Sequence, residues 1–107
     1  MIMRLAEVYV NGVYAGLLTE EAKGYRFAYD EEYVQGGNTL PVCLALPVRS
    51  EPYESYVLFP FFSNLLSEGS NRVFQTRYHH LRPEDDFGLL LATAGYDTIG
   101  NVTVRPR

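Results

Sequence analysis

The sequence has one cysteine and no tryptophan, and none of its apolar runs is long enough to cross a membrane. Because Cys43 has no second cysteine to pair with, an internal disulfide is excluded. A membrane-spanning helix needs about 20 consecutive apolar residues, and the longest runs here are much shorter. Residues 1–7 contain neither a long apolar segment nor a small-residue cleavage site, so they predict no secretory signal. Together these absences predict a soluble protein of the reducing cytoplasm.

Positive charge is also scarce. Nine Lys and Arg residues oppose thirteen Asp and Glu residues, which gives a formal net charge of -4. Proteins bind phosphate backbones through basic surfaces, so direct binding of nucleic acid is disfavoured. One stretch does gather basic side chains; we interpret it as a solvated helix face, with contact to an acidic partner as the alternative. That stretch contains Arg72, Arg77, His79, His80 and Arg82.

The remaining composition is that of an ordinary globular protein, with 47% hydrophobic and 21% charged residues. A chain of 107 residues has room for one domain, which we predict over residues 1–107. Nine tyrosines are unusual beside the absence of tryptophan. Tyrosine is enriched where proteins meet, and it is also a good strand former, so both uses remain open.

Three strands are predicted at the start of the chain. Residues 5–10 and 13–18 roughly alternate between apolar and polar, and Asn11-Gly12 lies between them. Asn and Gly tolerate the positive φ of a two-residue turn, so this is the strongest hairpin signal in the sequence. Residues 25–29 alternate again, with aromatic side chains at every second position. We therefore expect a three-stranded meander with one buried face.

The middle of the chain is less regular. Asp30 followed by acidic residues predicts a single helical turn over residues 30–35, which Gly36 and Gly37 would end. Residues 40–47 are bounded by prolines and predict a short strand or extended segment. Residues 50–58 are interpreted as a loop.

The second half changes to helical spacing. Pro60 suits the first turn of a helix, and apolar residues recur at helical intervals from there to Gly69. A second helical pattern covers residues 73–78. A third helix is predicted over residues 83–94, because its acidic start complements the helix dipole and Gly95 is a natural stop.

A last strand is predicted at residues 101–104, and it must return to the sheet. Strands, then helices, then one strand indicate an α+β fold. We expect an antiparallel sheet, made of the N-terminal meander and the returning strand, that is covered by about three helices.

One tripeptide, Asp86-Phe87-Gly88, matches the motif with which protein kinases hold magnesium. A kinase also needs a glycine-rich phosphate loop, a strand lysine and a catalytic-loop aspartate with a downstream asparagine, and no such set fits this sequence. We interpret the tripeptide as an acidic helix start followed by a core phenylalanine.

The other reactive side chains also lack the neighbouring residues that a catalytic or metal site requires. His79 and His80 are adjacent, so on a helix they point about 100° apart and cannot grip one metal together. Cys43 lies in an apolar segment and is expected in the core. Nothing like a nucleophile elbow surrounds the serines. We therefore predict no enzyme, and no catalytic, cofactor-binding or metal-binding residues.

Several segments follow one another in a characteristic order. They are Val10-Asn11-Gly12 with Gly16, Leu44-Ala45-Leu46-Pro47, the run Phe59-Pro60-Phe61-Phe62-Ser63-Asn64-Leu65-Leu66-Ser67-Glu68-Gly69, Asp86-Phe87-Gly88-Leu89-Leu90, and Gly95-Tyr96-Asp97-Thr98-Ile99-Gly100. In this order they resemble the N-terminal subdomain of HipA-type kinases, over nearly the whole chain. The most specific stretch, 61–69, is similar to the family's phenylalanine pair followed by Asn-Leu-Leu-Pro-Glu-Gly, with Ser67 in place of the proline.

The resemblance implies a function through another protein. In this family the subdomain precedes a Ser/Thr kinase body that acts as a toxin and is paired with a DNA-binding antitoxin. A chain that carries only the subdomain resembles the small component of HipBST-type split systems in bacteria. We therefore expect a non-catalytic, antitoxin-like partner of a separately encoded HipA-like kinase. A required activating half of a split kinase, a self-associating domain and the participation of a HipB-like DNA-binding protein remain open.

A partner interface should contain aromatic anchors and polar groups from the most specific stretch. Core burial is favoured for Phe61, Leu65 and Leu66, whereas Asn64 and Glu68 gain little by facing the core of their own chain and are the better contact candidates. The candidate interface residues are Phe59, Phe61, Phe62, Asn64, Glu68, Gly69 and Asp97.

Overall fold

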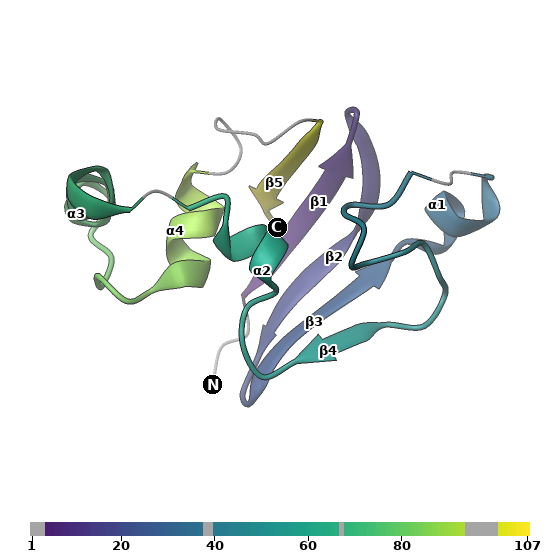
Figure 1. The fold of residues 1–107 in the computed structure, drawn as a ribbon, viewed down its shortest axis with the longest axis horizontal. Coiled ribbons are helices and arrows are strands. Elements are labelled where there is room, and N and C mark those ends of the chain that lie inside the picture. Colours follow the sequence, from purple (N-terminus) through teal and green to yellow (C-terminus); the bar gives the residue numbers. More distant parts are fainter. Residues whose placement is uncertain (1–3, 38–39, 67, 94–100) are drawn as a thin grey trace.

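The computed structural model describes residues 4–37, 40–66, 68–93 and 101–107. Its centre is a five-stranded sheet in the order β4-β3-β2-β1-β5 (Figure 1). Every pair of neighbouring strands is antiparallel. The predicted meander and returning strand are therefore confirmed, and a further edge strand is added. The strands are β1 (Leu5–Val10), β2 (Val13–Glu21), β3 (Gly24–Tyr29), β4 (Tyr53–Ser55) and β5 (Val102–Pro106).

The first hairpin forms where the sequence predicts it. Asn11 and Gly12 both have positive φ, at 52° and 77°, which is the backbone that a two-residue turn between twisted strands requires. Val10 pairs with Val13 across this turn. The alternation of β1 places Val8 and its neighbours at every second position in the core, so one face of the sheet is dry as expected.

The described residues contain four helices. They are α1 (Glu31–Gln35), α2 (Pro60–Ser63), α3 (Gly69–Tyr78) and α4 (Asp86–Thr93). α2 and α4 pack together, and α4 also packs against β5, while α3 lies beyond α4 at the far end of the molecule (Figure 1). The largest fully buried side chains come from both layers and include Phe27, Phe62, Phe87, Leu89 and Leu90. The α+β fold class is therefore confirmed.

Two expectations for the middle of the chain are wrong. Residues 40–47 were expected as a short strand or extended segment, but residues 42–46 form bends and a turn, because the Tyr29 hydroxyl accepts a hydrogen bond from the Val42 N–H (2.9 Å) and donates one to the Leu46 carbonyl. These two bonds hold the segment curled over the sheet. The expected loop at residues 50–58 contains β4, whose Tyr53 pairs with Phe27 of β3.

The helices also begin and end at other residues than predicted. α2 ends at Ser63 instead of continuing to Gly69, and the Leu65 and Leu66 N–H groups bond to carbonyls three residues back, which tightens the chain out of the helix. α4 begins at Asp86 instead of near Pro83. In the part of the chain that is described, no helix has the length and apolar character needed to cross a membrane.

Candidate partner-binding surface

The phenylalanines of the predicted interface divide between core and surface. Phe62 is fully buried, with its ring centroid 5.9 Å from that of Phe27 on β3, and Phe59 is 8% exposed. Both side chains hold α2 against the sheet. The predicted direct contact of Phe62 with a partner is therefore corrected to a supporting role, because its side chain has no exposed surface in this conformation. Phe59 keeps a small exposed area, and its contact with a partner stays a prediction.

Phe61 occupies an intermediate position. It is partly buried against the core, and its ring lies edge-on to that of Phe62 at 5.5 Å. It also lines a shallow hollow of about 320 Å³ between β4, α2 and the turns that replace the expected strand. Phe61 can therefore both support the core and contact a partner. The other residues that line the hollow are Cys43, Ala45, Leu46, Tyr53, Glu54, Ser55, Phe59 and Pro60.

The polar candidates lie on the surface, as predicted. Asn64 ends α2 and is exposed, and its backbone N–H donates to the Pro60 carbonyl at 2.9 Å. Glu68 is the N-cap of α3, but its side chain makes no capping hydrogen bond and stands exposed. Gly69 follows with φ of 63°. These three form an exposed polar edge between α2 and α3, whereas Asp97 lies outside the described residues.

The kinase-like tripeptide has a structural role. Phe87 is fully buried and stacks on Tyr25 with ring centroids 6.0 Å apart. Asp86 forms an ion pair with Arg72 of α3 at 2.6 Å. A Cβ on Gly88 would lie 2.3 Å from a carboxylate oxygen of Asp85, so only glycine fits there without displacing that group. The interpretation as a helix start with a core phenylalanine is confirmed for Phe87 and Asp86.

The carboxylate beside Gly88 joins α4 to the sheet. Asp85 accepts a hydrogen bond from the Gly88 N–H at 3.0 Å, which is the bond of a helix N-cap. It also accepts two hydrogen bonds from the Arg4 guanidinium, at 2.8 and 3.0 Å, and the same guanidinium binds Glu20 of β2. The hydrogen bonds from Arg4 hold the pKa of the Asp85 carboxyl below its usual value of 3.8.

Replacement of Asp85 separates its two roles. We expect Asp85→Ala to lower the free energy of unfolding by about 1–3 kcal/mol, because the cap and the partly exposed ion pair are both lost. Asp85→Asn should cost less, since its amide oxygen can still cap α4. Because the pKa of Asp85 is lower in the folded than in the unfolded protein, its charged form stabilises the fold at pH values above the unfolded pKa. The stability advantage of the unaltered chain over Asp85→Asn should therefore be lost as the pH falls below 3.8 and through the lower folded pKa. Urea titrations from pH 7 to pH 3 measure both effects. Equal costs for the two variants at pH 7 would contradict the capping role, and a cost of Asp85→Asn that stays constant as the pH falls would contradict the ion-pair role.

The two histidines and the cysteine lie in different parts of the fold. His79 and His80 are exposed at the end of α3, and Cys43 is only partly buried, against its expected place in the core. Within residues 4–37, 40–66, 68–93 and 101–107, no group of three or more His, Cys, Asp or Glu side chains is arranged to hold a metal.

Sequence analysis did not single out the aromatic face of α3. Phe74 and Tyr78 are 69% and 70% exposed, and Thr76 is the buried residue of this helix. The signal available in the sequence was the weak helical amphipathicity of residues 69–78, in which polar side chains occupy the positions between the aromatic ones.

Together, the sheet order and the packing of α2 and α4 define a small α+β domain. The family model described as HipA N-terminal domain matches residues 6–105, and the chain belongs to that family. The solved structure named N-terminal domain of HipA toxin superposes with a TM-score of 0.75 and 25% identity, covering 100% of this chain and 95% of that one. The resemblance noted from the sequence is thereby confirmed.

Two relatives differ greatly in length. Y4mE of Sinorhizobium fredii, which is named as a candidate kinase, is 35% identical over 107 residues, or 99% of this chain. The chain spans only 25% of the length of Y4mE. An uncharacterized protein of Haemophilus influenzae is 31% identical over 104 residues, and there the match covers 97% of this chain and 93% of the relative. The matched family is thus the N-terminal domain alone, and it occurs both in long and in short proteins.

Proposed function

We propose that this chain binds a separately encoded HipA-like Ser/Thr kinase in the cytoplasm and regulates it as a non-catalytic, antitoxin-like partner. The observation that carries the proposal is the contrast between the two relatives. The same domain makes up 25% of a candidate kinase and 93% of a short protein. A domain that is joined to a kinase body in one protein can bind such a body as a separate chain in another, because the surface between them serves in either arrangement.

The exposed edge between α2 and α3 is the contact surface that this proposal names first. Asn64, Glu68 and Gly69 offer polar groups there, and Phe61 offers an apolar one beside the hollow under α2. A stable interface of this kind buries on the order of 1,200–2,000 Å² in total, so the contact must extend beyond this edge.

Co-expression with a HipA-like kinase encoded in the same genome tests the proposal. We expect a single complex in size-exclusion chromatography at micromolar concentration, and a lower rate of kinase autophosphorylation when this chain is present. Two separate peaks would contradict binding. A higher rate would instead identify the chain as the activating half of a split kinase.

A matched pair of variants locates the contact. Asn64→Arg places a long cationic side chain on the proposed edge, whereas Gln35→Arg makes a similar change at the exposed end of α1. We expect the first variant to weaken binding at least about tenfold and the second to leave it unchanged, because only the first inserts bulk into the interface. Calorimetric titration of the kinase measures both; equal affinities would remove Asn64 from the contact surface.

A further inference from the structure

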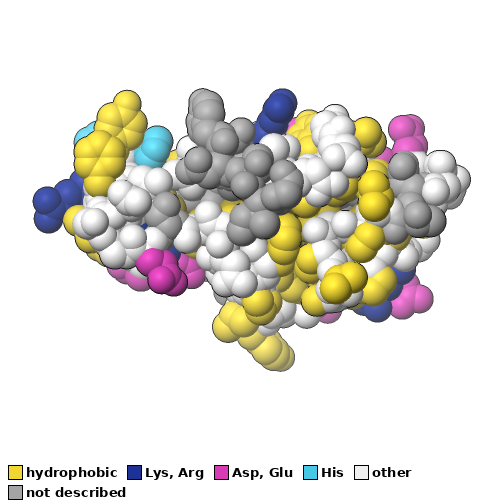
Figure 2. All heavy atoms as spheres, turned by 45° about the horizontal axis from the view of Figure 1, so that its top comes forward, with side chains coloured by type: hydrophobic (Ala, Val, Ile, Leu, Met, Phe, Trp, Pro, Cys, Tyr) yellow, Lys and Arg dark blue, Asp and Glu magenta, His cyan; other side chains and the backbone are white. Residues whose placement is uncertain are grey.

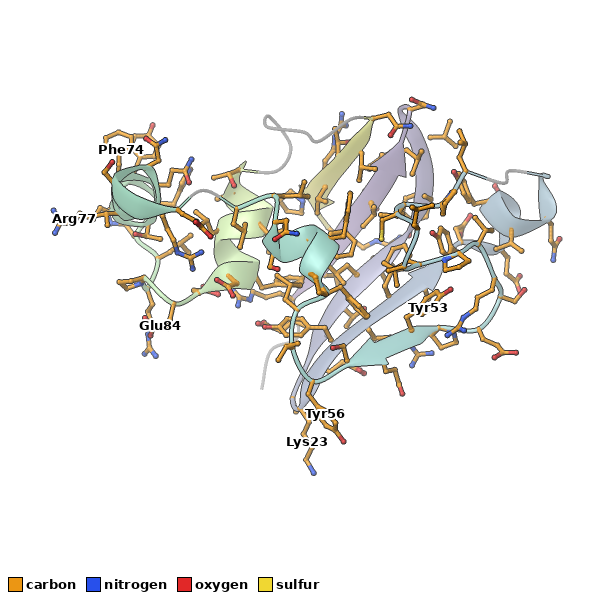
Figure 3. The ribbon with its side chains drawn as sticks, in the orientation of Figure 1. Lys23, Tyr53, Tyr56, Phe74, Arg77 and Glu84 are labelled. Carbon is orange, nitrogen blue, oxygen red and sulfur yellow. The ribbon has the colours of Figure 1, made fainter. Side chains whose placement is uncertain are left out.

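α3 presents its aromatic side chains to solvent. Because a helix turns by about 100° per residue, Val73, Phe74, Arg77 and Tyr78 share one face of α3. The three apolar members are 50%, 69% and 70% exposed. The Phe74 and Tyr78 rings stack with centroids 6.1 Å apart, so they form a continuous apolar ridge. Phe74 and Arg77 project from α3 away from the sheet (Figure 3).

The opposite side of α3 is joined to the segment that leads into α4. The Arg72 guanidinium donates to the Pro83 carbonyl at 2.9 Å and pairs with Asp86 at the start of α4. The Leu81 N–H donates to the Thr76 carbonyl at 2.7 Å. These contacts position α3, and its two rings already stack, so they lose little conformational entropy when they are covered.

A shallow apolar hollow adjoins the ridge. It has a volume of about 420 Å³ and lies between α3 and the following segment, so Val73 and Arg77 border both features. The ridge protrudes and the hollow beside it is concave, so together they can form a shape-complementary contact of the kind found in interface cores. The other residues that line the hollow are Gly69, Arg72, Thr76, Leu81 and Pro83.

Charge indicates what kind of surface fits there. Residues 69–82 contain three Arg, two His and no acidic residue, whereas the rest of the chain has six basic and thirteen acidic residues. Arg77 and Arg82 are exposed, and hydrophobic side chains stand beside His and Arg side chains at the upper left of Figure 2. The apolar ridge is thus bordered by positive charge on an otherwise acidic chain, and an acidic rim around an apolar pocket complements it.

We propose that the α3 face, formed by Val73, Phe74, Arg77 and Tyr78, docks into an apolar pocket with an acidic rim on the kinase partner. This inference rests on the proposed function and adds a second contact area, continuous with Glu68 and Gly69. A second copy of the chain fits less well, because a symmetric pairing through α3 would bring Arg77 of both copies together. Stacked aromatic rings and an arginine are also the residue types that dominate the binding energy of interfaces.

Calorimetric titration of the separately encoded kinase with single variants tests the inference. Phe74→Ser should weaken binding at least about tenfold, because it removes the centre of the ridge. Arg77→Glu should weaken binding to a similar degree and should make the affinity less dependent on salt, since it removes the charge attraction. Tyr56→Ser is the matched control: Tyr56 is 88% exposed but lies beside Lys23, far from α3 (Figure 3). It should bind like the unaltered chain.

The outcomes separate this inference from the proposed function. If the unaltered chain binds the kinase and Phe74→Ser binds equally well, the α3 docking is overturned while the proposed function stands. If the unaltered chain does not bind the kinase, both are overturned. A concentration-dependent dimer that Phe74→Ser abolishes in the absence of kinase would also overturn the inference, because it would assign the face to a second copy. All variants change exposed side chains, so unchanged melting temperatures check that they fold.

Discussion

Phe62→Ala is expected to lower the free energy of unfolding by about 3–5 kcal/mol, which is the usual cost of removing a fully buried phenylalanine ring. Its ring contacts three others, with centroids 5.9 Å from Phe27, 6.3 Å from Phe59 and 5.5 Å from Phe61. Those neighbours come from the sheet and from α2, so the cavity would open between the two layers. A domain of this size has about 5–15 kcal/mol of stability in total, and the variant should therefore be marginal at 37 °C.

Phe61→Ala provides the matched control for this prediction. The two phenylalanines are adjacent in the sequence, but Phe61 is only partly buried and borders an open hollow. Its removal should cost less than half as much, because water can fill the space that the ring leaves. Urea unfolding followed by tyrosine fluorescence measures both. Similar costs for the two variants would mean that Phe62 does not hold α2 against the sheet.

The sequence predicted those elements whose conformation depends on residues close to each other in the chain. The Asn11-Gly12 turn fixes its own backbone through positive φ, so the hairpin followed from two residues. The shift in the β1–β2 register between Val8 and Tyr9 was not predicted. β4 could not be found in this way, because its three residues form a strand only by pairing with β3. Residues 40–47 include strand-forming residues, but the Tyr29 hydroxyl bonds to this segment and bends it. That contact joins positions more than ten residues apart, so the local sequence pattern does not reveal it.

The candidate surface was predictable to a similar extent. Asn64 and Glu68 were expected outside because polar side chains gain nothing in an apolar core, and both are exposed. Periodicity could not decide which phenylalanine of the pair faces inward, since adjacent residues point about 100° apart on any helix. The exposure of Phe74 could not be predicted either, because a hydrophobic side chain is expected to be buried. Its orientation depends on the bonds of Arg72 to Pro83 and Asp86, which join distant positions of the sequence.

Tyr29→Phe is expected to lower the free energy of unfolding by about 2–4 kcal/mol. The hydroxyl is bonded to the Val42 N–H and the Leu46 carbonyl, and its removal leaves two buried main-chain groups without a partner at about 1–3 kcal/mol each. Tyr33→Phe is the control, because Tyr33 stacks on Tyr29 but its hydroxyl donates to the carbonyl of the exposed Leu40, which water can reach. It should cost less than about 1 kcal/mol.

Alkaline pH tests whether the Tyr29 hydroxyl is buried. Burial raises the pKa of Tyr29 to about 12 from its usual value of 10.0, so the folded state holds the phenolic proton more tightly than the unfolded chain. The resulting stabilisation is complete below pH 10 and is lost as the pH rises towards 12. The stability difference between the unaltered chain and Tyr29→Phe should therefore shrink over that interval. A difference that stays constant in urea titrations at pH 9, 10.5 and 11.5 would show that the hydroxyl is not held as the structure places it.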